Sequence, residues 1–176
     1  MIIPAVEIKK ILYATDLSEG ARYAFAYAVS LANAYKASIT ILHVVFENPN
    51  LDSMAGLHIG REEWLKIKKR HYDTAREALI SKKRENIAIK EVLHAFSEKT
   101  KSEDVPQSFD TDEIIVKSGK PEAIILDQAD KRNCDIIVMG SHGQGALAHL
   151  LIGSTARRVL RHTRKPVFLV PLPGNG

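Results

Sequence analysis

Short apolar runs alternate with segments of helical spacing along this chain, and this alternation restricts the possible folds more than any other feature. The runs that predict β-strands are residues 9–15, 38–45, 111–116, 135–139 and 166–171. The segments that predict helices are residues 19–35, 61–85, 119–132 and 154–162. Ser18 is the expected N-cap of the first, and Pro121 is expected near the first turn of the third. Two of the runs, 38–45 and 135–139, are apolar almost throughout, which is typical of parallel strands covered on both faces. We therefore expect the α/β class, with helices on both faces of a parallel sheet.

The chain is long enough for one such domain and short for two. Its 176 residues predict a single domain over residues 1–176. Residues 86–110 are the least constrained part. A helix is expected over 87–98, and the polar stretch 99–110, which contains Pro106, is expected to loop out. The prolines that flank the last apolar run suit a strand at the edge of the sheet.

Two strand ends carry functional groups. Ligands of parallel α/β sheets bind beyond the carboxyl ends of the strands, where Ala14, Thr15 and Asp16 follow the first run and Gly140 follows the fourth. The Asp16 carboxylate is placed either to accept from a ribose hydroxyl or to hold a divalent cation that bridges phosphates. The alternative is a turn residue that bonds the local backbone.

A glycine pattern after the fourth apolar run predicts a phosphate-binding loop. Gly140 and Gly143 let the backbone turn tightly and leave amide N–H groups uncovered by side chains. Nine residues later, Gly153 precedes Ser154 and Thr155, which indicates the start of the next helix with Ser154 as its N-cap. Amides at a helix N-terminus, together with the helix dipole, attract anions. We expect the bound anion to be the phosphate of a nucleotide.

Of two better-known glycine motifs, the Walker site is excluded and the dinucleotide-binding motif is disfavoured. No glycine is followed by Lys-Ser or Lys-Thr, as a Walker site requires. Residues 143–148 match a loose dinucleotide pattern that includes Gly145, but no acidic residue follows Asp135 to bind the ribose. His142 is either a phosphate donor or an ordinary exposed histidine, and His43 is expected to be packed in its strand. No histidine or cysteine pair has metal-ligand spacing and no Ser/His/Asp set can be assigned, so the pattern favours binding over catalysis.

The net charge of +4 is unevenly placed. No acidic residue follows Asp135, whereas five basic residues do: Arg157, Arg158, Arg161, Arg164 and Lys165. We interpret most of them as a solvated helix face, with a polyanionic ligand as the alternative. They are not interleaved with aromatic residues, so nucleic acid is not an expected partner.

Several absences predict a cytoplasmic protein. No apolar run approaches the length that spans a membrane. The first residues lack the basic start and apolar core of a signal peptide. The single cysteine, Cys134, rules out an internal disulfide framework and is expected to be a structural residue in a reducing compartment.

Taken together, these residues resemble the universal stress protein family, in its ATP-binding branch. The resemblance covers nearly the whole chain, through residues 9–16, 41–44, 135–143 and 165–171. The nucleotide motif of this family is G-x2-G-x9-G-[ST], which is matched without a gap by Gly140, Gly143, Gly153 and Ser154. The resemblance implies a Rossmann-like fold of the adenine nucleotide α-hydrolase kind, with five parallel strands in the order 3-2-1-4-5. Residues 86–110 look longer than is usual for the family and are expected to be an insertion.

The resemblance also implies where a nucleotide binds. Asp16 would lie near the ribose and Val44 against the adenine, while Met139 would pack under the nucleoside. The residues expected to bind the nucleotide are Ala14, Thr15, Asp16, Val44, Met139, Gly140, Ser141, His142, Gly143, Gly145, Gly153, Ser154, Thr155 and Ala156. ATP or another adenine nucleotide is the expected ligand, with Mg²⁺ or Mn²⁺ as its partner and Asp16 as the candidate metal ligand.

The implied function is a nucleotide-binding regulator of the stress response, and no catalytic residue is assigned. Three alternatives stay open: a slow ATPase or phosphotransferase, an interaction module that responds to AMP or cyclic AMP, and a partner-binding protein without nucleotide. A homodimer is expected along the last strand, because its apolar edge would otherwise favour aggregation. The residues of that edge are Val167, Phe168, Leu169 and Val170. No membrane partner is expected.

Overall fold

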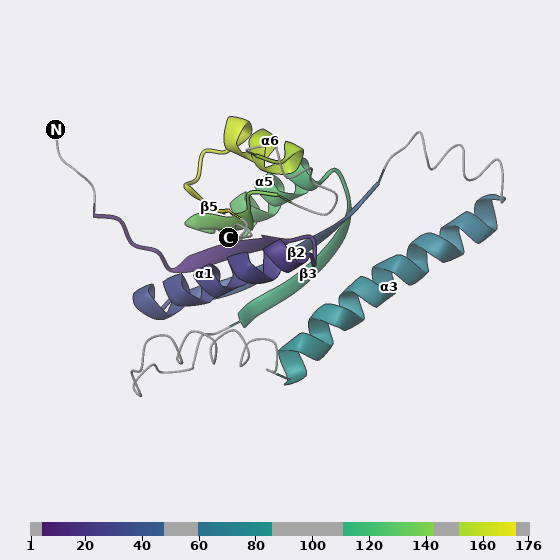
Figure 1. Cartoon of the computed structure of the whole chain (residues 1–176), viewed down its shortest axis with the longest axis horizontal. Coiled ribbons are helices and arrows are strands. Elements are labelled where there is room, and N and C mark those ends of the chain that lie inside the picture. The colour runs from purple at the N-terminus through teal and green to yellow at the C-terminus, as the bar shows by residue number, and fades with distance from the viewer. Residues whose placement is uncertain (1–4, 48–59, 86–110, 143–151, 172–176) are drawn as a thin grey trace, which may run out of the picture.

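A five-stranded parallel sheet forms the centre of the molecule, with the strand order β3-β2-β1-β4-β5 (Figure 1). A computed structural model of the chain describes residues 5–47, 60–85, 111–142 and 152–171. The strands are β1 Lys10–Thr15, β2 Ser38–Phe46, β3 Thr111–Gly119, β4 Ile136–Gly140 and β5 Val167–Val170. The expected fold class and strand order are confirmed, and β5 lies at an edge of the sheet as its flanking prolines predicted.

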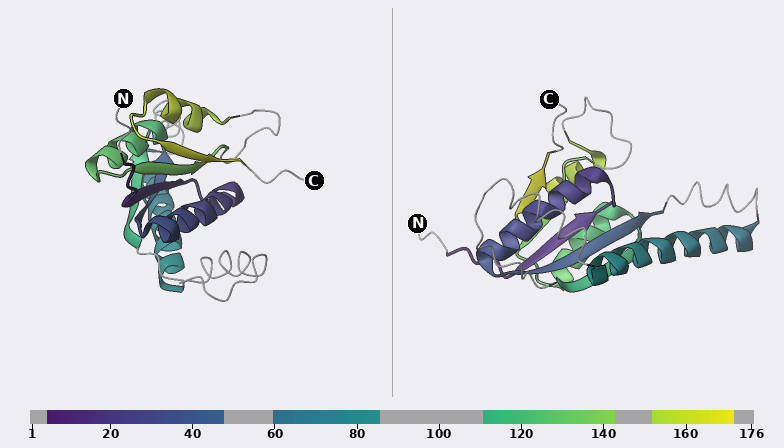
Figure 2. Two further views of the ribbon diagram at one scale, coloured as in Figure 1. Left: turned by 90° about the vertical axis from the view of Figure 1, so that its left-hand side faces the viewer. Right: turned by 60° about the horizontal axis from the view of Figure 1, so that its bottom comes forward.

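Helices cover both faces of the sheet (Figures 1 and 2). The helices are α1 Glu19–Tyr35, α3 Arg61–Glu85, α5 Pro121–Lys131 and α6 Ser154–His162. Successive side chains of a strand point to opposite faces. Ile11 and Tyr13 of β1 therefore pack in the apolar cluster that includes α1 and α3, whereas Leu12 and Ala14 pack in the cluster that includes α5 and α6. This double burial explains why the central strands are apolar throughout.

Two strands are longer than their apolar runs. The pairing of β2 with β3 continues through Val44 with Lys117, Val45 with Ser118 and Phe46 with Gly119. The spacing of apolar residues could not predict this extension. The hydrogen bonds between two strands join backbone groups, so they continue past the apolar residues. The extension carries Phe46 to the carboxyl end of the sheet.

The helix α1 lies close to the sheet because its inner face is made of small residues. Ala24, Ala28 and Ala32 are all buried. Ser18 caps the helix as expected, since its hydroxyl accepts a hydrogen bond from the Ala21 N–H at 3.2 Å. Lys36 ends it in the left-handed conformation, with φ 55°.

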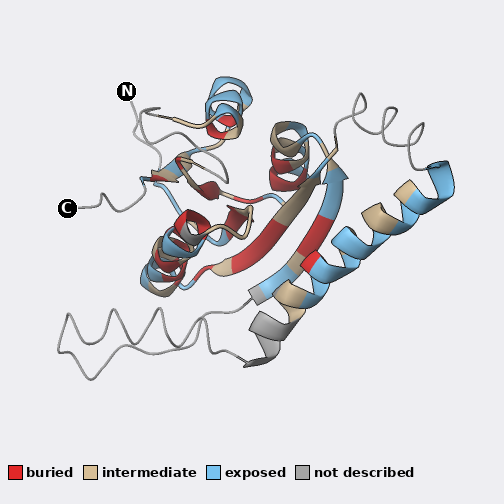
Figure 3. Ribbon diagram, turned by 45° about the vertical axis from the view of Figure 1, so that its right-hand side comes forward, coloured by how far each residue is buried: buried red, intermediate tan, exposed pale blue. Residues whose placement is uncertain are grey.

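The helix α3 extends beyond the sheet (Figures 1 and 3). Ala75 is buried in the core, and the hydroxyl of Tyr72 donates to the Val116 carbonyl of β3 at 2.7 Å. Leu65, closer to the start of the helix, is 56% exposed. The contacts of Tyr72 and Ala75 thus hold the middle of the helix to the rest of the molecule.

The expected helix over 87–98 and the expected insertion over 86–110 lie outside the described residues. Cys134 is buried, and burial raises the pKa of its thiol, as a structural cysteine requires. Within the described ranges, no helix is long and apolar enough to cross a membrane.

Candidate functional site

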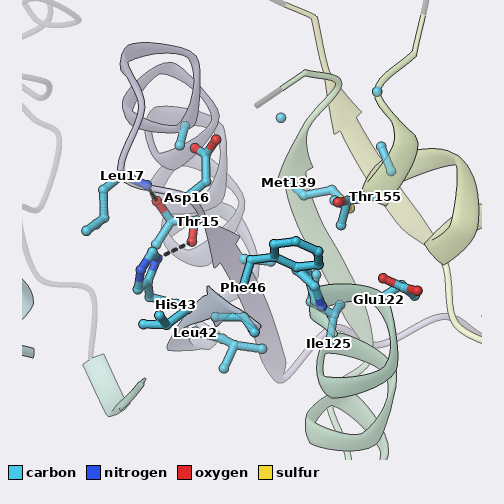
Figure 4. A pocket seen from close by; sticks show the side chains of 18 of the residues that line it. Thr15, Asp16, Leu17, Leu42, His43, Phe46, Glu122, Ile125, Met139 and Thr155 are labelled. Carbon is cyan, nitrogen blue, oxygen red and sulfur yellow. Dashed lines mark hydrogen bonds between the residues drawn. The ribbon is translucent and has the colours of Figure 1, made fainter. Parts of the chain in front are cut away.

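A cleft of about 1140 Å³ lies at the carboxyl ends of the strands (Figure 4). Its walls come from the ends of β1, β2 and β4, from the starts of α5 and α6, and from the middle of α3. Loops beyond the carboxyl ends of parallel strands are where ligands of this architecture bind. The two strand ends that the sequence singled out, those of β1 and β4, are neighbours in the sheet.

The turn after β1 is fixed by its own side chains. The Thr15 hydroxyl accepts from the Leu17 N–H at 3.0 Å, and the Asp16 carboxylate accepts from the Ser18 N–H at 3.0 Å. Leu17 has a positive φ of 65°, which is uncommon for a residue with a side chain. Asp16 therefore acts as a turn residue, and it also lines the cleft (Figure 4). The two roles that the sequence left open are compatible.

Buried Ser141 joins three elements at the end of β4. Its N–H donates to the Val170 carbonyl of β5 at 2.7 Å, and its carbonyl accepts from the Gly153 N–H at 2.8 Å. Its hydroxyl lies 2.8 Å from Nδ1 of His142. The start of α6 is thereby held against the end of β4, although residues 143–151 between them are not described.

Gly140 is required by a close approach of the backbone. A Cβ at this position would lie 3.2 Å from the carbonyl oxygen of His142 and 3.8 Å from that of Gly20. The first distance is tighter than nine in ten real Cβ contacts, so a side chain would force the turn to shift by a few tenths of an ångström. This tight turn is what the glycine pattern predicted for the strand end.

The N-cap of α6 is Gly153, and the expectation of Ser154 as N-cap was wrong. Gly153 has φ −65° and ψ 159°, and Ser154 is the first residue of the helix. The cap makes no side-chain hydrogen bond. The first N–H groups of a helix have no carbonyl one turn earlier. The amides of Ser154, Thr155 and Ala156 consequently keep their capacity to bind an anion, which a serine cap would have reduced.

Every expected nucleotide-binding residue that the structure describes lines this one cleft. These residues are Ala14, Thr15, Asp16, Val44, Met139, Gly140, Ser141, His142, Gly153, Ser154, Thr155 and Ala156. The other two, Gly143 and Gly145, lie outside the described residues. The cleft thus brings together the β1 turn, the β4 end and the α6 start, which are far apart in the sequence.

His43 was expected only to be packed in its strand, but the structure also places it in the wall of the cleft. Its ring is half-buried, and its Nδ1 lies 2.8 Å from the Thr15 carbonyl. A carbonyl can only accept, so Nδ1 carries the proton in this contact. The residue also lines the cleft (Figure 4). It is packed in its strand as expected, but it also connects the ends of β1 and β2.

The cleft has further walls that sequence reasoning did not assign. Helix α3 contributes Arg70, His71 and Thr74, and the start of α5 contributes Pro121, Glu122 and Ile125. On α6, Arg158 lies 3.4 Å from Glu122, an ion pair that connects the two helices. Proline after Gly119-Lys120 did mark the start of α5. Its position beside the cleft follows from the tertiary structure alone.

The described residues offer no preformed metal site. Among them, no group of three or more histidine, cysteine, aspartate or glutamate side chains is placed to hold a metal ion. Among the described residues that line the cleft, Asp16 is the one that places a carboxylate at its β1 end. A divalent cation here would take its other oxygen ligands from water and from a ligand's phosphates, as Mg²⁺ does at many phosphate sites.

The fold and the cleft define an α/β protein with an open cleft at the carboxyl end of a parallel sheet. A model of the universal stress protein family matches residues 7–171. The chain is 33% identical to universal stress protein MJ0577 of Methanocaldococcus jannaschii, over 94% of this chain and 96% of that protein. The chain therefore belongs to the universal stress protein family.

Solved structures of the family share this fold. That of MJ0577, a protein whose biochemical function was assigned from its structure, has a TM-score of 0.61 and 26% identity over 97% of this chain and all of that one. Universal stress protein UspA from Lactobacillus plantarum has a TM-score of 0.65 and 23% identity, over 94% of this chain and 99% of that one. A universal stress protein in complex with cAMP has a TM-score of 0.51 and 20% identity, over 94% and 98% of the two chains.

Proposed function

We propose that this universal stress protein binds ATP, or another adenine nucleotide, and acts as a nucleotide-dependent regulator of the stress response. The observation that carries the proposal is the α6 N-terminus. Gly153 leaves its amides uncapped, and Ser141 holds them at the end of β4 inside the cleft. Such an N-terminus binds phosphate through its N–H groups and its dipole.

The remaining walls suit the other parts of a nucleotide. Apolar Ala14, Val44 and Met139 line the cleft beside the β1 turn, where a base and sugar can be buried. Asp16 is held in that turn, and its carboxylate can accept from ribose hydroxyls. Mg²⁺ or Mn²⁺ would accompany the phosphates, and Asp16 is the side chain we expect to contact the cation.

The described residues favour a protein that binds ATP without hydrolysing it rapidly. Among them, no group of three or more histidine, cysteine, aspartate or glutamate side chains is placed to hold a metal ion. The cleft does bring a hydroxyl beside an imidazole, those of Ser141 and His142 at 2.8 Å, but Ser141 is buried. A slow ATPase is the alternative, and it would show as ATP turnover well above that of a Gly153→Val variant. A module that responds to AMP or cyclic AMP is the second alternative, since a protein of the same fold is known in complex with cAMP.

Gly153→Val should abolish nucleotide binding while the fold is retained. The φ and ψ of Gly153 are ones that valine adopts without strain, so the backbone can stay as it is. The branched side chain would cover the α6 amides and block the phosphates. Calorimetric titration with ATP, ADP, AMP and cyclic AMP, each with and without Mg²⁺, measures the effect.

Ala34→Val is the matched control, because it adds the same side chain at an exposed position of α1. ATP as the tightest ligand, with Mg²⁺ increasing its affinity, would support the proposal. Tighter AMP or cyclic AMP binding would favour the sensor alternative. Unchanged ATP affinity in a folded Gly153→Val protein would refute the phosphate site, and no binding by the unaltered chain would leave a partner-binding role.

A further inference from the structure

Phe46 lines the cleft, and its side chain is unusually exposed for a large apolar residue. It is the last residue of β2, and its large apolar side chain is 62% exposed. Other large apolar side chains are exposed on this molecule, but of those described only Phe46 lines the cleft. An exposed phenylalanine forgoes the stabilisation that burial would bring. Its place in the cleft indicates that a ligand completes its surroundings.

The pairing of β2 with β3 leaves Phe46 without a side chain directly opposite it. Phe46 lies opposite Gly119 in the ladder. Cross-strand side chains normally cover one another on a sheet face. Gly119 has no side chain, and Ile124 of α5 lies 3.0 Å from where its Cβ would be. No side chain at position 119 therefore covers the Phe46 ring.

The strand alternation determines which part of the cleft the ring faces. Leu42 and Val44 pack in the cluster on the α5 and α6 face of the sheet, and Phe46 continues this series at the same spacing. Ile125 and Met139 belong to that cluster and line the cleft as well. Figure 4 shows the Phe46 ring projecting from the end of β2 into the opening between Met139 and Ile125.

The opposite face of β2 points toward α3. His43 and Val45 alternate with these residues and point to the face that carries α3. There the cleft is lined by Arg70, His71 and Thr74. Phe46 belongs to the α5 and α6 side of the cleft, where Leu42, Ile125 and Met139 are apolar and where Glu122 and the start of α6 supply the polar groups.

We propose that Phe46 stacks on the base of the bound nucleotide and favours purines over pyrimidines. This inference rests on the proposed function and names the residue that selects the base. The apolar subsite consists of Phe46 with Ala14, Leu42, Ile125 and Met139. A base that stacks on an aromatic side chain gains affinity through its flat face, and the two-ring purine overlaps the phenyl ring more than the one-ring pyrimidine does.

The test compares Phe46→Ala, Phe46→Leu and Phe46→Trp in titrations with ATP, GTP, CTP and inorganic triphosphate. Loss of one stacked base should weaken ATP and GTP binding about tenfold or more in Phe46→Ala. Phe46→Leu keeps the apolar surface but loses the aromatic face, so it should also weaken binding. Phe46→Trp should retain it. CTP should lose less affinity than the purines, and inorganic triphosphate none.

Tyr35→Ala is the control, because Tyr35 is a half-exposed aromatic residue at the far end of α1 and should leave all affinities unchanged. Unchanged ATP affinity in both Phe46→Ala and Phe46→Leu would overturn the stacking role while the proposed function stands. An equal loss for ATP and inorganic triphosphate would also overturn it, because the phosphate site would then have been disturbed. Failure of the unaltered chain to bind any nucleotide would overturn both proposals. Because Phe46 is exposed, the variants should fold, and Phe46→Trp checks this independently.

Discussion

At the scale of single residues, Asp16 serves the turn and faces the cleft at the same time. Its carboxylate accepts from the Ser18 N–H, and Ser18 in turn caps α1. Such a turn bond is worth about 1 kcal/mol. Binding of a cation would depend on the negative charge of this carboxylate, whereas the turn bond needs only an oxygen that accepts. Substitutions that keep the acceptor and remove the charge can therefore separate the two roles.

Asp16→Asn should retain the stability of the protein and weaken Mg²⁺-dependent ATP binding about tenfold. The asparagine carbonyl can still accept from Ser18, but it carries no charge for a cation. Asp16→Ala should lose both properties, including about 1 kcal/mol of unfolding free energy. Urea unfolding and calorimetry measure the two effects. Full Mg²⁺-dependent affinity in Asp16→Asn would show that Asp16 is a turn residue only.

At the scale of elements, the end of α5 is joined to β3 by a two-pronged ion pair. Arg132 donates through Nε to Oε2 of Glu113 at 2.7 Å and through Nη2 to Oε1 at 2.9 Å. The hydrogen bond from Arg132 is the main reason why the pKa of Glu113 is below its usual value. The side chain of Glu113 is half-exposed, so screening by solvent limits what the pair contributes.

Lowering the pH should remove the stability that the Glu113–Arg132 ion pair contributes. A carboxyl group whose folded pKa is lowered stabilises the fold above its unfolded pKa, about 4.3, and the stabilisation is lost as the pH falls through the folded value. Glu113→Gln should therefore be less stable than the unaltered chain at pH 7, by up to about 1 kcal/mol. The difference should shrink progressively below about pH 4.

Urea unfolding at several pH values measures this difference. Arg132→Gln should lose more than Glu113→Gln at neutral pH, because Nη1 of Arg132 also donates to Oε1 of buried Gln128. The double variant should lose little more than Arg132→Gln alone, since the ion pair is already absent from it. Additive losses would mean that Glu113 and Arg132 act independently. A difference between Glu113→Gln and the unaltered chain that stays constant down to pH 3 would contradict the ion-pair explanation.

At the scale of the whole molecule, β5 is an edge strand, and no other strand of the described residues pairs with its outer side. Of its residues, Val170 is buried in the core, whereas Phe168 is 36% exposed and packs against Tyr27 with 5.7 Å between ring centroids. An open edge with an apolar side chain favours pairing with another chain. We propose that a second copy covers it, as the resemblance to the family implied.

Phe168→Lys should convert the dimer to a monomer, because a buried lysine would lose its hydration at the interface. Sedimentation velocity at several concentrations measures the change. Leu65→Lys is the control, since Leu65 is exposed on α3, away from β5. A monomeric unaltered chain, or a Phe168→Lys variant that remains dimeric, would contradict an interface along β5.

Local patterns account for much that the sequence predicted correctly. The Ser18 cap, the proline at the start of α5 and the alternation of strands and helices all depend on neighbours within a few residues. The assignment of the α6 cap failed for a local reason too. Glycine and serine are both acceptable caps, so Gly153-Ser154 is ambiguous until the backbone is seen.

The sequence by itself determined the α/β class, the order of its helices and strands and, through its motifs, the family and the parts of the cleft at the ends of β1 and β4 and at the start of α6. The tertiary structure decided how distant segments meet. Ser141 contacts Val170 and Gly153, and Phe46 lies opposite Gly119, through pairings that no short-range pattern encodes. The same pairings bring α3 and α5 to the cleft. Periodicity reports which face of an element is buried, whereas only the packed sheet determines which elements share its carboxyl end.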